Sequence, residues 1–221
     1  MASSILDRIS PYLLLILTTL FWAGNFNLAR AVSTQIPPMG LSYWRWAIAA
    51  LLLMPFVWRQ MLSVWPVFKQ HWLLVLSLSI FGVTGFNSLV YLGLQTTTAV
   101  NAVLMQSVCP ILIIVFASVV LGERTSRLQW LGVLVSLLGV VVILIRGDMA
   151  VLKTLDFKIG DLIVLLATLS WAIYTVLLRK LPAKLKGLPI LGYTVVIGSM
   201  MILPLYLQET LIQNRPMLFS W

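Results

Sequence analysis

A stretch of 53 residues, from Gln70 to Gly122, contains no Asp, Glu, Lys or Arg. An α-helix needs about 20 apolar residues to cross the hydrocarbon core of a bilayer, so this stretch can hold two membrane spans. The turn between them is expected over 93–98, where Gln95 and three threonines interrupt the apolar run. The chain is therefore predicted to cross a membrane more than once.

The remaining uncharged windows add five spans to these two. Only 10% of the 221 residues are charged and 61% are hydrophobic, whereas a soluble domain carries about 25% charged residues. The apolar runs are continuous rather than alternating, which favours helices over a β-barrel. The predicted fold class is all-α, a polytopic membrane helix bundle of about seven spans over residues 11–29, 41–58, 72–92, 99–121, 128–145, 160–178 and 188–207.

The net charge of +9 could indicate nucleic-acid binding, but the basic residues fall between the predicted spans, as the positive-inside rule describes. With a cytoplasmic N-terminus, nine of the fifteen Lys and Arg residues lie in inner segments and five in outer segments. The last, Arg45, lies within the second span. We therefore expect the bilayer, and no nucleic acid, as a partner.

An internal repeat relates the first and sixth spans. When residues 13–30 are aligned without gaps to residues 162–179, 8 of 18 positions are identical, among them Trp22 with Trp171 and Arg30 with Arg179. The repeat period covers five spans, an odd number, so the second copy must be inverted in the bilayer. Inverted repeats are typical of secondary transporters. The predicted units are a five-helix repeat over residues 1–149 and a partial repeat of two helices over residues 150–221.

Several segments resemble the EamA branch of the drug/metabolite transporter superfamily. They are Arg45–Trp46, Tyr91–Pro110, Leu121–Arg124, Gln129–Gly132 with Gly139, Gly160–Leu162 and Ser170–Tyr174. The resemblance covers essentially the whole chain and implies ten spans in two inverted five-helix repeats. It also implies a multi-pass location in the cell membrane (a bacterial inner membrane) and alternating-access transport of small metabolites such as amino acids or drugs, most often outward. This chain has seven predicted spans, so it is expected to be either a truncated fragment without transport activity or a protein completed by a second chain.

Uncharged polar and aromatic residues at membrane depth are the candidates for a substrate pathway. The pairs Trp22 with Asn25, Asn87 with Tyr91, and Trp171 with Tyr174 each share a helix face by their spacing. Asn101 and Gln106 lie in the fourth span, where Pro110 removes a helical N–H and predicts a kink. The candidate pathway residues are Trp22, Asn25, Asn87, Tyr91, Asn101, Gln106, Trp171 and Tyr174. The alternative is that the amides bond helices together and the aromatic rings pack.

Charged candidates are fewer. Arg45 either extends to the membrane interface or faces the cavity and attracts an anion. Glu123 and Arg124 form either a loop ion pair or a gate element. All the acidic residues are expected at the periphery of the spans, which disfavours a proton relay through a buried carboxylate.

Other classes of function fit less well. The lone His71 and the single Cys109 offer no metal-ligand cluster, and no glycine-rich phosphate loop is present, so we expect no enzyme activity, no catalytic residue, no metal and no cofactor. A seven-helix receptor would give no reason for a five-span repeat. The small residues Gly132, Ser136 and Gly139 predict close helix packing or contact with a second copy in a homodimer.

Overall fold

The structure, a computed structural model, describes residues 10–145 and 158–213. Every regular element in these ranges is helical. The helices are α1 (Pro11–Ala31), α2 (Pro38–Ser63), α3 (Trp65–Gln70), α4 (Trp72–Leu78), α5 (Phe86–Gly93), α6 (Ala99–Ser107), α7 (Cys109–Leu121), α8 (Arg127–Ile145), α10 (Ile159–Arg179) and α11 (Leu188–Leu207). Two π-helices, η2 (Ser79–Gly85) and η4 (Gln208–Ile212), and a 3₁₀ turn, η3 (Ala183–Leu185), complete the set.

Six continuous helical segments in the described ranges are long and apolar enough to cross a membrane. They are α1, α2, the run from Trp72 to Gly93, the run from Ala99 to Leu121, α10, and the run from Leu188 to Ile212. The remaining predicted span corresponds to α8, which has 19 residues. The predicted all-α membrane bundle is confirmed, while the predicted boundary at residues 149 and 150 lies outside the described residues.

The helices are interrupted at the two places that the sequence predicts, the turn between the third and fourth spans and the kink near Pro110. The third span ends at Gly93 and the fourth begins at Ala99, with Thr98 as its N-cap accepting a hydrogen bond from the N–H of Asn101. The fourth span is divided at Val108, two residues before Pro110. By contrast, Pro55 lies inside α2, which continues beyond the predicted end at residue 58 to Ser63.

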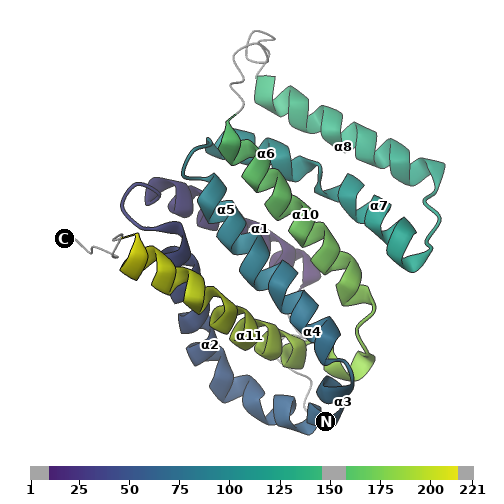
Figure 1. The fold of residues 1–221 in the computed structure, drawn as a ribbon. Helices are drawn as coiled ribbons and strands as arrows, with labels where there is room; N and C mark the ends of the chain where they lie inside the picture. Colours follow the sequence, from purple (N-terminus) through teal and green to yellow (C-terminus); the bar gives the residue numbers. More distant parts are fainter. Residues whose placement is uncertain (1–9, 146–157, 214–221) are drawn as a thin grey trace.

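The centre of the bundle is formed by the third span and α10, which lie side by side in Figure 1. Their backbones meet at Gly93 and Gly160, where a Cβ atom on either glycine would collide with the other helix. The end of α1 joins them there, because Arg30 Nη1 donates to the carbonyl of Leu94 at 2.6 Å. The α6–α7 span packs on the other side of α10.

Helices α2 and α11 form an antiparallel pair. The start of α2 meets the end of the last span, where the N–H of Gly40 donates to Glu209 Oε2 at 2.9 Å. The far end of α2 meets the start of α11, where the hydroxyl of Tyr193 donates to the carbonyl of Met61 at 2.7 Å. The pair packs tightly, since a Cβ on Gly192 would lie 2.9 Å from Val57 Cγ2.

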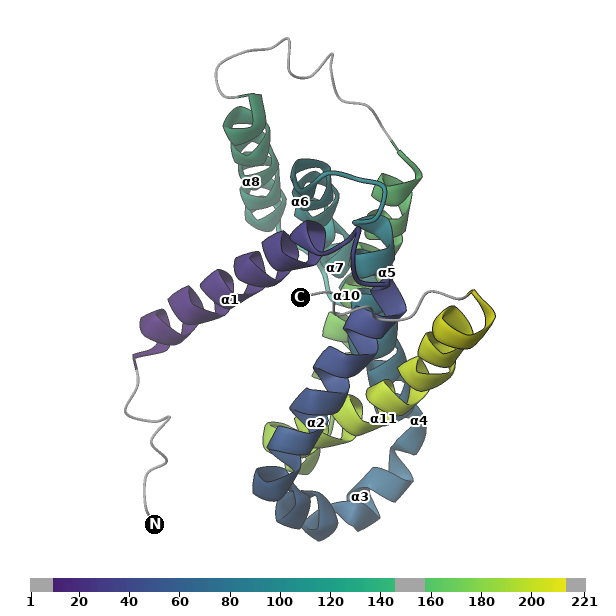
Figure 2. The same ribbon diagram turned by 90° about the vertical axis from the view of Figure 1, so that its left-hand side faces the viewer.

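Two helices lie at the edge of the bundle. The N-terminal half of α1 runs away from the other helices (Figure 2), and Tyr12 in it is 78% exposed. Helix α8 packs along one edge against α6. Outside the adjacent turns of α8, no described atom lies within 4 Å of a Cβ built on Gly132 or Gly139. These two glycines therefore do not mediate close helix packing within the described part of the chain, whereas Ser136 lines a cavity described below.

Candidate functional site

A cavity of about 360 Å³ lies between α1, α2, the third span, α10 and α11. Five of the predicted pathway residues line it: Trp22, Asn25, Asn87, Trp171 and Tyr174. Arg45, predicted as a possible anion-binding residue, lines it as well. The rest of the lining is mainly apolar and aromatic, with the hydroxyls of Thr18 and Thr194. The described lining contains no Asp or Glu.

Arg45 is held inside this cavity by neutral acceptors. Its Nη1 donates to Asn25 Oδ1 at 2.7 Å, and its Nη2 donates to Asn87 Oδ1. The hydroxyl of Tyr91 donates to the same Asn25 oxygen at 2.8 Å. The guanidinium carbon lies 4.8 Å from the ring centroid of Trp46 and 5.5 Å from that of Tyr91. The side chain of Arg45 therefore faces the cavity, as in the second of the two possibilities, while its role toward an anion stays a prediction.

Asn87 connects this arginine to the π-helix of the third span. Its amide nitrogen donates to the carbonyls of Gly82 at 3.3 Å and Val83 at 3.2 Å, while its oxygen accepts from Arg45. A π-helix is rare and occurs most often at functional sites. Gly82 is required here because a Cβ would lie 2.6 Å from Tyr174 Cε2, so the wide turn lies directly against an aromatic wall of the cavity.

Four aromatic rings form that wall. The ring centroids of Trp22 and Trp171 are 5.2 Å apart in an edge-to-face arrangement. The ring centroid of Phe86 lies 4.7 Å from that of Trp171, and the ring centroid of Tyr174 lies 5.1 Å from it. Trp22 and Trp171 are the residues matched by the internal repeat, so the repeat correctly pointed to two side chains that meet in the bundle.

A second cavity, of about 280 Å³, lies behind the same rings. Trp22, Phe86 and Trp171 line both cavities, so these three rings form a shared partition. Gln106 and Cys109 line the second cavity from the two halves of the broken fourth span. The Nε2 atom of Gln106 is buried and has no hydrogen-bond partner within residues 10–145 and 158–213.

The structure places two predicted pathway residues outside the linings of these two cavities. Tyr91 lies outside the lining and donates its hydroxyl to Asn25 Oδ1, as described above. The side chain of Asn101 donates to Asp161 Oδ2 at 3.3 Å instead. Asp161 also accepts from Thr97 Oγ1 and, at 2.7 Å, from the N–H of Lys158. This arrangement corresponds to the structural alternative, in which polar side chains bond helices together.

The buried acidic residues were missed by the sequence reasoning. Asp161 is 2% exposed and Glu209 is 5% exposed, although both lie at helix ends, as expected. Each accepts a hydrogen bond from a backbone N–H in the first turn of a helix or just before it. An acidic residue three positions into a helix is typical of a capping arrangement, so this signal could have predicted the bond between Asp161 and the N–H of Lys158, although not the burial of Asp161.

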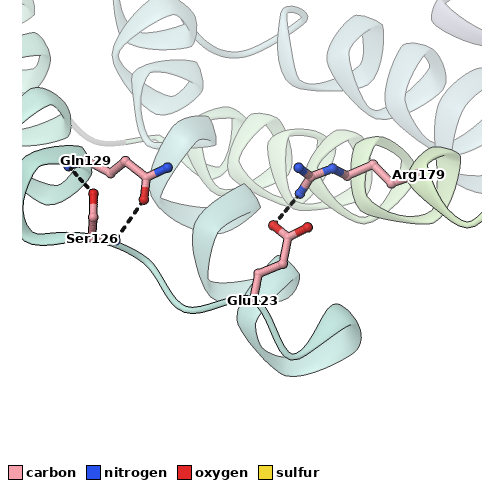
Figure 3. A network of polar contacts seen from close by, with 4 residues as sticks. All are labelled: Glu123, Ser126, Gln129 and Arg179. Atoms are coloured by element: carbon pink, nitrogen blue, oxygen red, sulfur yellow. Dashed lines mark hydrogen bonds and ion pairs between the residues drawn. The ribbon is translucent and has the colours of Figure 1, made fainter.

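The predicted pair of Glu123 and Arg124 is replaced by a different pair. Glu123 Oε2 lies 2.7 Å from Arg179 Nη1 at the end of α10, as Figure 3 shows. The two side chains are about half exposed, so the bond contributes little stability. Beside it, Ser126 and Gln129 cap the start of α8 with reciprocal bonds of 2.8 and 3.2 Å. Arg124 lines a separate shallow pocket next to Trp130.

The chemistry available at the site is recognition rather than catalysis. No group of three or more His, Cys, Asp or Glu side chains that could hold a metal occurs among the described residues. The first cavity offers one guanidinium, several amide and hydroxyl groups, and aromatic faces. Such a combination, mostly apolar with a few placed polar groups, is typical of a small-molecule site.

Comparison with known proteins agrees with this geometry. The EamA-like transporter family model matches residues 9–145 and 158–220. An uncharacterized transporter, YyaM, of Bacillus subtilis is 28% identical over 199 residues, which cover 90% of this chain and 65% of the relative. A probable terminal-alkyne amino-acid exporter of Streptantibioticus cattleyicolor is 26% identical, with coverage of 86% and 62%. An S-adenosylmethionine uptake transporter of Rickettsia prowazekii is 23% identical, with coverage of 83% and 60%.

This chain thus spans less than two thirds of the length of each of these relatives. No solved structure matches it. The family model nevertheless covers most of the chain and includes every helix that contributes to the two cavities. The chain belongs to the EamA-like transporter family.

Proposed function

We propose that this protein moves small metabolites across the cytoplasmic membrane by alternating access, with the cavity beside Arg45 as its binding site. The observation that carries the proposal is the cavity of about 360 Å³ between helices of the two predicted repeats. Binding sites for small molecules usually have about this size or more. In transporters built from inverted repeats the site lies at the interface between the repeats.

The antiparallel packing of the repeat partners supports the proposed inversion. The second and seventh spans of the sequence prediction, α2 and α11, lie antiparallel as described above. The first and sixth, α1 and α10, meet through Trp22 and Trp171. In α1 the end near Arg30 contacts Leu94, and in α10 the start near Gly160 contacts the adjacent Thr97 region. A two-fold axis in the membrane plane between these helices accounts for both pairs.

The bundle described here has seven predicted spans, and the proposed transporter has ten. We propose that a second chain supplies the helices that complete the second repeat. The exposed apolar faces of α1 and α8 support this, since membrane helices can use such faces for packing as well as for lipid contact. A cytoplasmic N-terminus follows from the distribution of basic residues and belongs to the same proposal.

Export is the proposed direction, as the family resemblance implies. The names of the two relatives that specify a direction differ, one being an exporter and the other an uptake transporter. Both names specify a solute that contains an amino acid, which supports a small metabolite with a carboxyl group as the cargo class. The alternative, a fragment without transport activity of its own, makes the opposite prediction in the experiment below.

A growth test of cells that overproduce the 221-residue chain measures transport directly. Cells are challenged with toxic amino-acid analogues and drugs, and efflux of a radiolabelled analogue that gives resistance is then measured. Trp22→Ala should lower efflux while the amount of protein in the membrane stays constant, because Trp22 lines both cavities. Gly132→Ala on α8, where no described neighbour lies within 4 Å, is the control and should leave efflux unchanged.

Each outcome has a clear meaning. Resistance that depends on Trp22 but not on Gly132 supports transport through the cavity. If the chain inserts into the membrane and produces no resistance or efflux, the fragment alternative is favoured. Equal efflux by the wild type and Trp22→Ala would count against the cavity as the pathway.

A further inference from the structure

The guanidinium of Arg45 carries a positive charge that no described carboxylate neutralises. Its hydrogen-bond partners among the described residues, Asn25 and Asn87, are neutral amides. An arginine at membrane depth is costly to bury and is usually paired or functional. The charge is therefore held in position by its neighbours but remains available to an anion.

Within residues 10–145 and 158–213, the guanidinium also has hydrogen-bond donors that no side chain or carbonyl accepts. Arginine offers five N–H groups in a planar fork, and the bonds to Asn25 and Asn87 use two of them. These two bonds, together with the contact to the face of Trp46, fix the plane of the fork. A preorganised fork of this kind binds carboxylate and phosphate groups with two parallel hydrogen bonds.

The rest of the lining limits what can be attached to the anionic group. Phe21, Trp22, Phe86, Val83 and Val195 present rings and aliphatic groups to the cavity. The described lining has no carboxylate that could neutralise a cationic group. The site is thus suited to a small molecule with one anionic end and an apolar, preferably flat, body.

We propose that Arg45 and its amide partners Asn25 and Asn87 form the subsite for a carboxylate on the transported solute, whose apolar body lies against Trp22 and Trp171. This inference rests on the proposed transport function and specifies its substrate class. Arg45 binds the carboxylate directly, and Tyr91 positions Asn25 through its hydroxyl. The carboxylate neutralises Arg45 and uses N–H groups that the described residues leave free.

Three probes of similar size test the proposal on the purified chain in a neutral maltoside detergent. They are 3-phenylpropionate, its neutral amide 3-phenylpropionamide, and the cation 3-phenylpropylamine, each titrated by isothermal calorimetry. The wild type should bind the carboxylate at least about tenfold more tightly than the amide, since hydrogen bonds to charged groups are the stronger ones. The amine should bind most weakly.

Variants on one helix assign this preference to Arg45. Arg45→Gln should abolish the tenfold preference, and Arg45→Lys should retain part of it, because lysine keeps the charge and loses the fork. Arg59→Gln is the matched control: Arg59 is an exposed arginine on the same helix, outside the cavity. It should bind all three probes as the wild type does.

The comparison of the three probes on the wild type keeps the test informative even if Arg45→Gln fails to fold. Equal binding of carboxylate and amide overturns the carboxylate subsite but leaves the proposed transport function intact. A lack of measurable carboxylate binding overturns the subsite too, and lack of efflux in the growth test is the separate result that removes the transport function. Displacement of the probe by equimolar phosphatidylglycerol would make the anion site a lipid site and refute the solute assignment.

Discussion

The contact between Gly93 and Gly160 makes a strong prediction about stability. A Cβ on Gly160 would lie 2.6 Å from Thr96 Oγ1 and 2.8 Å from the backbone nitrogen of Thr97, in addition to a collision with the carbonyl of Gly93. Carbon–oxygen contacts in proteins are normally about 3.3 Å or longer. Gly160→Ala therefore requires α10 to move away from the third span by roughly 0.5–1 Å at this point.

The magnitude follows from two opposing effects. Replacing glycine by alanine within a helix contributes about 0.5–1 kcal/mol of stability, but overpacking against a backbone costs about 1–3 kcal/mol. The displacement would also disturb Asp161, the next residue, which bonds to Thr97. We expect Gly160→Ala to destabilise the protein by about 2 kcal/mol, or roughly 5 °C in the unfolding midpoint for a chain of this size.

The control for this prediction is Gly132→Ala on α8, where a Cβ meets nothing within 4 Å. At that position the substitution only improves the helix propensity of the residue, so the thermal unfolding midpoint should stay the same or rise slightly. Both variants are measured by thermal unfolding in detergent, followed by fluorescence-detected size-exclusion chromatography. Equal midpoints for the two variants would refute the close approach of the third span and α10.

Three further predictions concern polar residues. Asp161→Asn should lower the free energy of unfolding by about 1–3 kcal/mol, because the carboxylate that accepts from the Thr97 hydroxyl and from a backbone N–H is lost. Chemical denaturation in mixed micelles measures this, and an unchanged denaturation midpoint would contradict it. Glu123→Gln should change stability by less than about 1 kcal/mol, because its ion pair with Arg179 is about half exposed; a large loss in the same assay would show that the bond is a structural clamp. N-ethylmaleimide should modify Cys109, the only cysteine, faster in Trp22→Ala than in the wild type. Both residues line the second cavity, and the smaller alanine side chain widens that cavity for the reagent. Mass spectrometry of a time course measures the modification rates, and equal rates would argue against a shared partition.

The positions of the helices could be predicted because membrane spans are set mainly by length and the absence of charge. The uncharged run from Gln70 to Gly122 indicated two spans and a turn, and the structure has both spans with the turn in the expected place. The end of α2 was predicted less well, because the predicted span stopped where the uncharged window ends before Arg59, whereas the helix continues to Ser63 and also passes through Pro55. Proline removes one helical bond, and neighbouring groups in a membrane helix can compensate for that loss.

The candidate site could be predicted in part. The repeat and the helix spacing indicated Trp22, Asn25 and Trp171, which all line the first cavity. The same reasoning could not distinguish Asn101, because an amide at membrane depth serves equally well in a cavity or in a bond between helices. Its actual partner, Asp161, is 60 residues away in the sequence, and only the packing of α6 against α10 brings the two together.

The direction of Arg45 was open for a related reason. A long side chain near the end of a span can reach either the interface or the protein interior, and its helix position alone fits both. The acceptors Asn25 and Asn87, on two other spans, decide between these directions. Pairings of this kind depend on how three spans rotate about their axes, which composition and charge do not determine.

The π-helix of the third span also has a consequence for backbone solvation within a membrane. The wide turn of a π-helix leaves some carbonyl groups without a good hydrogen-bond donor within the helix. The hydrocarbon core contains no water that could donate to them. Here the hydroxyl of Ser170 donates to Phe81 O at 2.8 Å, and the amide of Asn87 donates to the carbonyls of Gly82 and Val83. These side chains take the place of water, so the wide turn can persist at the depth where Gly82 and Val83 line the cavity.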